Sequence, residues 1–388
     1  MIQKVSFRNF KAYRSLDLEL EPFTVLVGPN ASGKTTLLRG VDFIANLGAL
    51  TIGSQGLSPT TRVKPGVRAY GSSAPVELGI EGSWGGTAGS FRVTSTDAVP
   101  NVGADPGPES QDFKARGTWG GGLFHVGESR ASGTFNPPLE VFGSALSSTT
   151  VLRFEPRRLA EPSYSEEAVP RIHFDGSGLA SVLAHLKLSW DEAFAQIELA
   201  LKQVVPAVRR IRIERATVEQ TAIRTISLDE QRHEVPEKRT LWGQKIVLDM
   251  KGAKGVPADA AGEGTLMALG LLTVLMGPTQ PRLVLLDDIE LGLHPAAQGK
   301  LIEVLRKLQE RDPELQIIAT SHSPFILNYL DPKEVRMTFL AENGFARCEK
   351  LTAHPEFERW KGMMSPGEFW STVGESWLEK ASEPAAHE

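Results

Sequence analysis

A strand, a glycine loop and a helix follow one another over residues 22–44, and this run constrains the fold more than any other. Residues 24–27 have the apolar, β-branched character of a central strand, and the apolar residues of "TTLLRGVDFI" recur at helical spacing. Between them stands G-x-x-x-x-G-K-T, from Gly28 to Thr35. Its glycines let consecutive N–H groups converge on phosphate oxygens at the start of a helix. The run predicts an α/β fold with a phosphate loop.

Two residues of this loop carry specific chemistry. Lys34 would reach the β- and γ-phosphates of a nucleotide, and Thr35 would ligate Mg²⁺. The alternative is a chance glycine turn, but the strand before the loop and the helix after it disfavour that interpretation.

Composition bounds the remaining possibilities. The chain has 388 residues, enough for two or three packed units or one large α/β domain with insertions. Its net charge of −5 excludes a generally basic, DNA-coating surface but leaves room for a local basic patch. The single cysteine, Cys348, excludes an internal disulfide framework and suits a reducing compartment. Neither a signal peptide nor a membrane-spanning run is recognisable, so we expect a cytoplasmic protein without membrane contacts.

Carboxylates end a second apolar strand in "LLDDIELGLHP". The run Leu283 to Leu286 leads into Asp287, Asp288 and Glu290, and clustered carboxylates repel one another and resist desolvation. A further strand, from Gln316, ends at Ser321-His322-Ser323. In a parallel sheet the carboxyl ends of strands converge on one crevice, so these groups should meet the phosphate loop. We therefore expect the carboxylates to face Mg²⁺ and the γ-phosphate beyond it.

Weaker signals lie elsewhere. Residues 51–150 are rich in glycine and contain short strand-like pieces, which predicts an antiparallel β subdomain with long loops. Residues 178–203 predict one or two amphipathic helices, and the turn at 262–265 opens a strongly apolar helix, a second potential anion site. Two arginine groups either lie on solvated faces or contact nucleic-acid phosphates. They are Arg153, Arg157 and Arg158, and Arg210 and Arg212.

Four motifs in order, "GPNASGKTT", "AGEGTL", "LLDDIELGLHP" and "ATSHSPFIL", resemble an ABC-type ATPase of the RecF/SMC-like branch, and within it the stand-alone OLD-type ATPases of the AAA_21 and AAA_15 kinds. The resemblance covers residues 1–330, and the opening "KVSFRNFKAYRSLDLEL" resembles that branch's N-terminal hairpin. It implies an α/β ABC-ATPase head with a mostly parallel sheet, an antiparallel β subdomain and no long coiled coil. We expect an N-terminal lobe at 1–160, an insertion at 161–255 and a C-terminal lobe at 256–388.

The resemblance also implies a mechanism. Two heads would close around ATP, each nucleotide lying between the phosphate loop of one subunit and the signature turn of the other. Asp287 would hold Mg²⁺ through water, His322 would sense the γ-phosphate, and Asp288 or Glu290 would be the catalytic carboxylate. The implied nucleotide contacts are Gly28, Pro29, Asn30, Ala31, Ser32, Gly33, Lys34, Thr35, Thr36, Gly262, Glu263, Gly264 and Thr265.

Three departures from the family pattern suggest slow turnover. In the signature turn, residues 262–265, Gly262 stands where the family has a serine. Asp288 stands where the family usually has a glutamate, directly after the aspartate that holds the metal. The family has a glutamine that couples the metal to the attacking water, and no clear glutamine ends "VLRFEP" here. That role would fall to Glu155, to a distant glutamine, or to no residue.

Three functions compete. The first is a Mg²⁺-dependent ATPase switch acting with DNA or RNA in repair or antiviral defence; its nuclease would be a separate protein, because residues after 330 leave no room for one. The second is a transporter nucleotide-binding subunit, which the missing LSGGQ-like signature disfavours. The third is an ATP-dependent dimerisation module with little hydrolysis. A GTPase is disfavoured because no N-K-x-D motif occurs.

Two local predictions can be compared with the structure. If strand geometry persists past Leu286, Asp287 points to the metal side and Asp288 and Glu290 to the other, with Glu290 near the signature side or in solvent. In the segment 354–378, aromatic residues are dense, which predicts either a docking surface or packing against its own lobe. They include Trp360, Phe369, Trp370 and Trp377.

Overall fold

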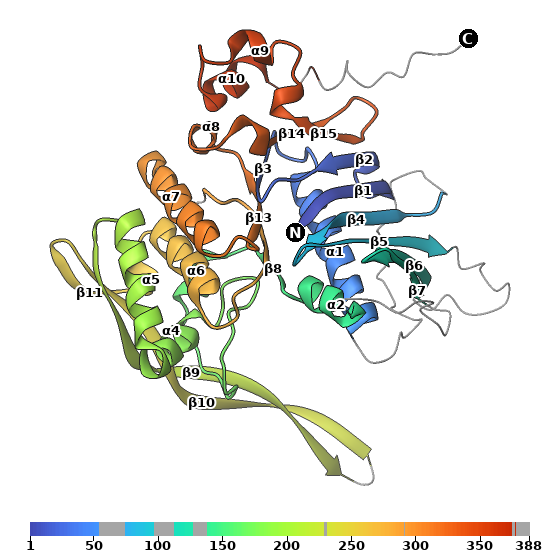
Figure 1. The fold of residues 1–388 in the computed structure, drawn as a ribbon. Helices are drawn as coiled ribbons and strands as arrows, with labels where there is room; N and C mark the ends of the chain where they lie inside the picture. Colours follow the sequence, from blue (N-terminus) through green and yellow to red (C-terminus); the bar gives the residue numbers. More distant parts are fainter. Residues whose placement is uncertain are drawn as a thin grey trace, which may run out of the picture. The chain divides into compact units, whose positions relative to one another are not determined.

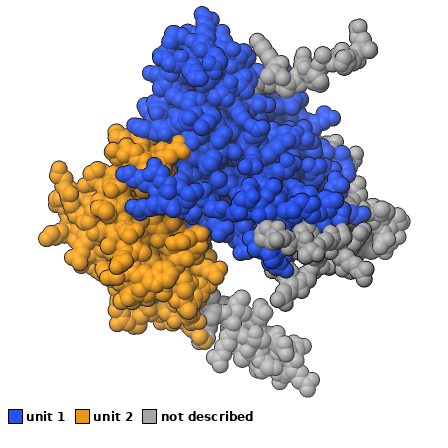
Figure 2. Space-filling model, viewed as in Figure 1, with its two compact units in different colours: residues 1–151, 281–290, 307–388 blue, residues 152–280, 291–306 orange. Residues whose placement is uncertain are grey.

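The computed structural model describes residues 1–53, 74–96, 112–126, 138–228, 231–290, 292–374 and 377. It divides the chain into two compact units, coloured separately in Figure 2. Unit 1 contains residues 1–151, 281–290 and 307–388, and unit 2 contains residues 152–280 and 291–306. This division differs from the three expected segments, because the signature turn groups with the insertion while the acidic strand groups with the phosphate loop.

An antiparallel sheet forms one layer of unit 1, in the order β2-β1-β4-β5-β6-β7 (Figure 1). The strands are β1 (Ile2–Phe10), β2 (Tyr13–Glu19), β4 (Glu77–Trp84), β5 (Thr87–Thr96), β6 (Asp112–Trp119) and β7 (Gly122–Val126). Alternate residues such as Phe7, Ile80 and Phe91 are buried, the pattern of a sheet with one solvated face. Helix α2 (Leu139–Ser147) covers the buried face, where the Trp119 and Phe142 rings stack with centroids 4.9 Å apart. The predicted hairpin and β subdomain are confirmed; most of the predicted loops lie outside the described residues.

A central sheet forms the second layer of unit 1, in the order β15-β14-β3-β13-β12-β8. The strands are β3 (Phe23–Val27), β8 (Thr149–Leu152), β12 (Leu283–Leu286), β13 (Gln316–Ser321), β14 (Val335–Leu340) and β15 (Ala346–Lys350). Strands β14, β3, β13 and β12 are parallel, and every residue of β3, β12 and β13 is buried. Continuous apolar runs are typical of parallel strands covered on both faces. The predicted α/β fold with a mostly parallel sheet is confirmed.

Helix α1 (Lys34–Gly53) joins the two layers of unit 1. Its side chains Leu37, Val41 and Ile44 are fully buried in a single core that also contains Phe7 of β1 and Ile318 of β13. The helix that begins at the phosphate loop is therefore anchored against both sheets, which fixes the loop relative to the strand ends around it.

The end of unit 1 consists of short helices: α8 (Pro324–Leu327), η2 (Pro332–Glu334), η3 (Leu351–Ala353), α9 (Phe357–Trp360) and α10 (Pro366–Val373). Phe357 and Phe369 are buried with their rings edge to face, and the His354 ring lies 5.1 Å from that of Phe369 and 5.0 Å from that of Trp377. Burial in this cluster lowers the pKa of His354. Phe357 and Phe369 thus pack against their own unit, while Trp360, Trp370 and Trp377 are half-buried, so the docking surface stays a prediction.

Unit 2 combines helices with a long hairpin. It contains α3 (Pro156–Ala160), α4 (Leu179–Ser189), α5 (Asp191–Val204), η1 (Ala258–Ala260), α6 (Glu263–Met276) and residues 295–306 of α7 (Pro295–Arg311). Its sheet pairs β9 (Val208–Leu228), β10 (Gln231–Met250) and β11 (Ala253–Pro257). The two predicted helices are present, whereas β9 extends well beyond the expected short strand. No long coiled coil occurs in the described part of the chain.

Both predicted arginine groups lie in unit 2, and one arginine of each group forms ion pairs there. Arg212 contacts Glu214 at 2.6 Å and Asp249 at 3.6 Å. Arg158 contacts Glu161 at 3.1 Å and Asp175 at 3.7 Å. These contacts favour the solvated-face interpretation over nucleic-acid contact for these two arginines.

Candidate nucleotide site

The phosphate loop is shaped by residues with positive φ between β3 and α1. Gly28 has φ +149°, Ala31 +62° and Gly33 +101°, values that favour glycine. A Cβ on Gly28 would lie 2.2 Å from the Thr338 carbonyl oxygen, and one on Gly33 would lie 2.7 Å from the Ala346 Cβ. The loop is therefore pressed against β14 and β15, and neither glycine can be replaced without moving it.

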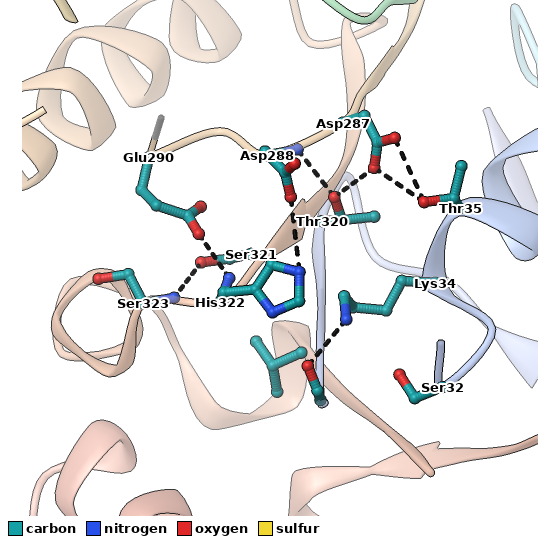
Figure 3. A network of polar contacts seen from close by, with 12 residues as sticks. Ser32, Lys34, Thr35, Asp287, Asp288, Glu290, Thr320, Ser321, His322 and Ser323 are labelled. Carbon is teal, nitrogen blue, oxygen red and sulfur yellow. Dashed lines mark hydrogen bonds and ion pairs between the residues drawn. The ribbon is translucent and has the colours of Figure 1, made fainter. Parts of the chain in front are cut away.

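Lys34 lies inside the curve of this loop (Figure 3). Its side chain is buried, and its Nζ donates to the carbonyl oxygens of Gly28 at 2.8 Å and Pro29 at 2.7 Å. Carbonyl dipoles compensate a buried ammonium less completely than an anion does. Together with the N-terminus of the 20-residue helix α1, this cation makes the loop fit a phosphate group.

Asp287 lies at the end of β12, facing the first turn of α1. Its carboxylate accepts from the Thr35 hydroxyl at 3.2 Å and from the Thr320 hydroxyl at 2.7 Å (Figure 3). Hydroxyl and carboxylate oxygens are the donors that Mg²⁺ prefers, and Mg²⁺ usually takes only one or two protein ligands beside phosphates and water. Thr35 and Asp287 thus fit a Mg²⁺ site beside the loop.

Thr320 was missed by the sequence reasoning. It is fully buried on β13, and its hydroxyl also accepts from the Asp288 N–H at 2.8 Å. One threonine therefore orients both adjacent aspartates. The signal was available, because Thr320 immediately precedes Ser321-His322 at a strand end, but only the pairing of β13 with β12 shows its contact.

Asp288 does not continue the strand. Strand β12 ends at Leu286, and Asp288 has φ +56°, so the predicted alternation of side chains is wrong. This left-handed conformation directs the Asp288 carboxylate towards His322, whose Nε2 lies 3.7 Å away (Figure 3). Aspartate and asparagine are several-fold enriched in this conformation, which accounts for a short acid at this position.

Glu290 holds the backbone of the loop Ser321-His322-Ser323. Its Oε1 accepts from the His322 N–H at 2.5 Å, a contact that the sequence did not predict, while the expected contact of Glu290 with the signature side of a dimer stays a prediction. Its Oε2 is buried and has no hydrogen-bond partner among the described residues. Glu290 therefore positions the backbone of His322, while Asp288 faces the imidazole ring.

The loop, the three acids and His322 all lie in unit 1, at the carboxyl ends of the neighbouring strands β3, β13 and β12 (Figure 3). The remaining loop residues Pro29, Asn30, Ser32 and Thr36 lie in the same turn or at the start of α1, where the Ser32 hydroxyl contacts that of Thr338 at 2.6 Å. The structure thus brings together every predicted residue of this half of the site.

The signature turn lies in unit 2. Gly262 is the N-cap of α6, and both Gly262 and Glu263 are exposed, whereas Thr265 is buried and donates its N–H to the Gly262 carbonyl at 2.9 Å. A Cβ on Gly264 would lie 2.3 Å from the Gly292 carbonyl oxygen, so the turn is packed against the loop after the acidic strand. Glu155 is exposed at the N-cap of α3.

Two family models match the chain. The model described as "AAA ATPase domain" matches residues 1–56, which include the phosphate loop. The model described as "AAA domain, putative AbiEii toxin, Type IV TA system" matches residues 157–328, which include the signature turn, the acidic strand and His322.

Curated relatives match short segments. An OLD nuclease from Thermus scotoductus is 43% identical over 44 residues, covering 11% of this chain and 8% of the relative. The DNA replication and repair protein RecF is 51% identical over 45 residues in Roseiflexus castenholzii (11% of each chain). It is 34% identical over 90 residues in an Arthrobacter species (21% of this chain, 22% of the relative). The chain thus spans between 8% and 22% of the length of these relatives.

The fold is shared over almost the whole chain. The crystal structure of the SmcHead bound to the C-winged helix domain of ScpA has a TM-score of 0.51 and 13% sequence identity, covering 92% of this chain and 99% of that one. Among the described helices none is long and apolar enough to cross a membrane. By its motifs, its two family-model matches and its SMC-head fold, the chain resembles the ABC-type ATPases of the RecF/SMC-like branch, with short matches to OLD and RecF.

Proposed function

We propose that the chain is a Mg²⁺-dependent ATPase switch that dimerises head to head around ATP and controls a separate partner acting on nucleic acid. The observation that carries this proposal is the meeting of Lys34, the Thr35–Asp287 pair and the Asp288–His322 pair at one edge of the central sheet. Turnover of ATP by the purified chain, lost when Mg²⁺ is chelated, tests it. Tight ATP binding without turnover would favour the dimerisation module with little hydrolysis.

Each residue has a role in this proposal. The loop N–H groups and Lys34 bind the phosphates, and Thr35 and Asp287 hold Mg²⁺, which neutralises developing phosphate charge when bound. Asp288 accepts a proton from the attacking water, and His322, beside it at 3.7 Å, contacts the γ-phosphate side. Glu290 and Thr320 keep these two groups in place through hydrogen bonds of 2.5 Å and 2.8 Å.

The proposed dimer uses the signature turn. Gly262 and Glu263 are exposed at the start of the otherwise buried, 14-residue helix α6, whose first N–H groups form an anion-binding end. In the dimer this end would face the γ-phosphate bound by the partner protomer. Gly262 offers backbone only, which weakens the contact relative to a serine hydroxyl.

Gly262→Ser should therefore strengthen ATP-dependent dimerisation. A Cβ at this position meets only the Thr265 Oγ1, at 3.8 Å, so a serine fits without displacing a neighbour. One added hydrogen bond to a charged group contributes about 1.5–3 kcal/mol, or roughly tenfold or more in dimer affinity. Sedimentation at graded protein concentrations with ATP measures this, and Gly262→Ala is the control. A serine variant no tighter than the alanine variant would contradict the proposed position of the turn.

Nucleic acid is the proposed partner class, and a basic face of unit 1 supports it. On the solvated side of the antiparallel sheet, Arg92 of β5 stands directly opposite Arg116 of β6, which stands opposite His125 of β7. This face is hollowed by about 420 Å³. Arg92 forms a long, exposed ion pair with Glu81, at 3.9 Å. Like charges placed directly opposite each other destabilise a sheet, and a bound phosphate would relieve the repulsion between Arg92 and Arg116.

Arg92→Gln with Arg116→Gln should weaken binding of a labelled DNA duplex roughly tenfold at low salt. It should also reduce the slope of log K against log salt by about 0.9 for each phosphate that the variant no longer neutralises. Fluorescence anisotropy over a salt series measures both. Arg8→Gln is the matched control, because Arg8 lies on the same sheet but pairs with Asp17 at 2.5 Å. Equal weakening in the control, or unchanged binding in the double variant, would remove this face from the proposal.

The biological setting follows from the relatives' names alone. One family description names a toxin of a type IV TA system, and the curated relatives are named as a nuclease and as DNA replication and repair proteins. These names support antiviral defence or DNA repair as the setting, with the nuclease supplied by a separate protein. They give no support to a transporter subunit.

A further inference from the structure

Helix α10 makes a close backbone contact with α8 (Figure 1). A Cβ on Gly367 would lie 2.0 Å from the Pro324 carbonyl oxygen and 2.6 Å from the Asn328 Oδ1. The Gly367 N–H donates to the same Asn328 Oδ1 at 3.0 Å. Since Pro324 is the first residue of α8 and Asn328 its C-cap, α10 contacts both ends of this short helix.

Helix α8 starts immediately after the switch histidine. Only Ser323 separates His322 from Pro324, and the Ser323 N–H donates to the Ser321 Oγ at 3.0 Å. On its other side His322 is held by Glu290 through its backbone N–H. Because the connection is this short, a displacement of α8 would also displace His322.

Helix α10 is held by contacts within the C-terminal segment of unit 1. Ser365 and Glu368 form a capping box at its N-terminus, and Phe369 is 3% exposed within the aromatic cluster of the C-terminal segment. It therefore supports α8 as a fixed element, because moving α10 would break the buried ring contacts of Phe369 with Phe357 and His354.

We infer that α10 is a positioning element for the catalytic switch: its contact through Gly367 sets the place of α8 and thereby the distance between His322 and Asp288. This inference rests on the proposed function of His322. A misplacement of about 1 Å at a reacting group can lower a rate by about 100-fold. A shift of that size in α8, passed on to His322, would therefore be large enough to slow hydrolysis. Gly367 and Asn328 are then positioning residues, acting from outside the site.

Gly367→Ala should lower kcat for ATP at least tenfold while the Kd for ATP stays unchanged, because the phosphate loop is untouched. Asn328→Ala removes the hydrogen bond without adding bulk and should act in the same direction with a smaller effect. Thr372→Ala is the matched control on α10, since the Thr372 hydroxyl is exposed and donates to the Glu368 carbonyl of its own helix. An unchanged kcat in both Gly367→Ala and Asn328→Ala would overturn the inference.

A double-mutant cycle separates positioning from general damage. If α10 acts through His322, Gly367→Ala should lower kcat no further when His322→Ala is already present. Additive effects would overturn the inference, and if Gly367→Ala does not fold, the same cycle with Asn328→Ala decides it. An unchanged kcat in His322→Ala alone would instead contradict the role of His322 in the proposed function, which keeps the two failures distinguishable.

Discussion

Asp288→Asn should lower single-turnover ATP hydrolysis by about 100-fold or more while ATP still binds, because the variant lacks the proposed general base. Asparagine tolerates the left-handed conformation at φ +56° as readily as aspartate does, so the substitution removes the charge without straining the turn. Rapid-quench measurement with enzyme in excess over ATP isolates the chemical step from product release.

Glu290→Gln is the comparison for this variant. Glutamine keeps an oxygen that can accept from the His322 N–H, so we expect a smaller reduction of the rate than in Asp288→Asn. An unaffected rate in Asp288→Asn beside a collapsed rate in Glu290→Gln would transfer the catalytic role to Glu290.

Lys34→Ala should raise the Kd for ATP by about 100-fold or more. The variant cannot form two charge-assisted phosphate contacts, each contributing roughly 1.5–3 kcal/mol. Titration calorimetry with ATP and Mg²⁺ measures the change. Because Lys34 also bonds two carbonyls of its own loop, the thermal midpoint of the variant should be recorded alongside.

Arg39→Ala is the matched control for Lys34→Ala. Arg39 lies on the same helix and is exposed to solvent, so its removal deletes one positive charge from α1 outside the loop. It should leave the Kd for ATP within a factor of about two, since salt screens the interaction of an exposed charge outside the loop with the bound phosphates. An unchanged Kd for ATP in Lys34→Ala would contradict the assignment of the phosphate loop.

The local parts of the site could be predicted from the sequence. The phosphate loop follows from glycine spacing between a strand and a helix, and Asp287 and His322 follow from polar residues that end apolar strands. These signals are local or depend only on the rule that parallel strands end at one edge of a sheet. The same rule cannot show which strands are neighbours, so the contact between Thr320 and Asp287 stayed hidden.

The remaining features depend on backbone conformation and distant packing. Alternation past Leu286 was assumed, but the positive φ of Asp288 turns its side chain towards His322. The aromatic segment near the C-terminus could dock a partner or pack internally on composition alone, and the burial of Phe369 shows only that part of it packs internally. Gly367 carries no sequence signal, because its contact with Pro324 joins helices some forty residues apart.

The central claim, that ATP closes a dimer of heads, is tested most directly by measuring the mass of Asp288→Asn by light scattering with and without ATP and Mg²⁺. The account predicts a shift from monomer to dimer when both are present, and no shift when Lys34→Ala is added to the same chain. A mass that stays monomeric with ATP bound, confirmed by titration in the same buffer, would contradict it.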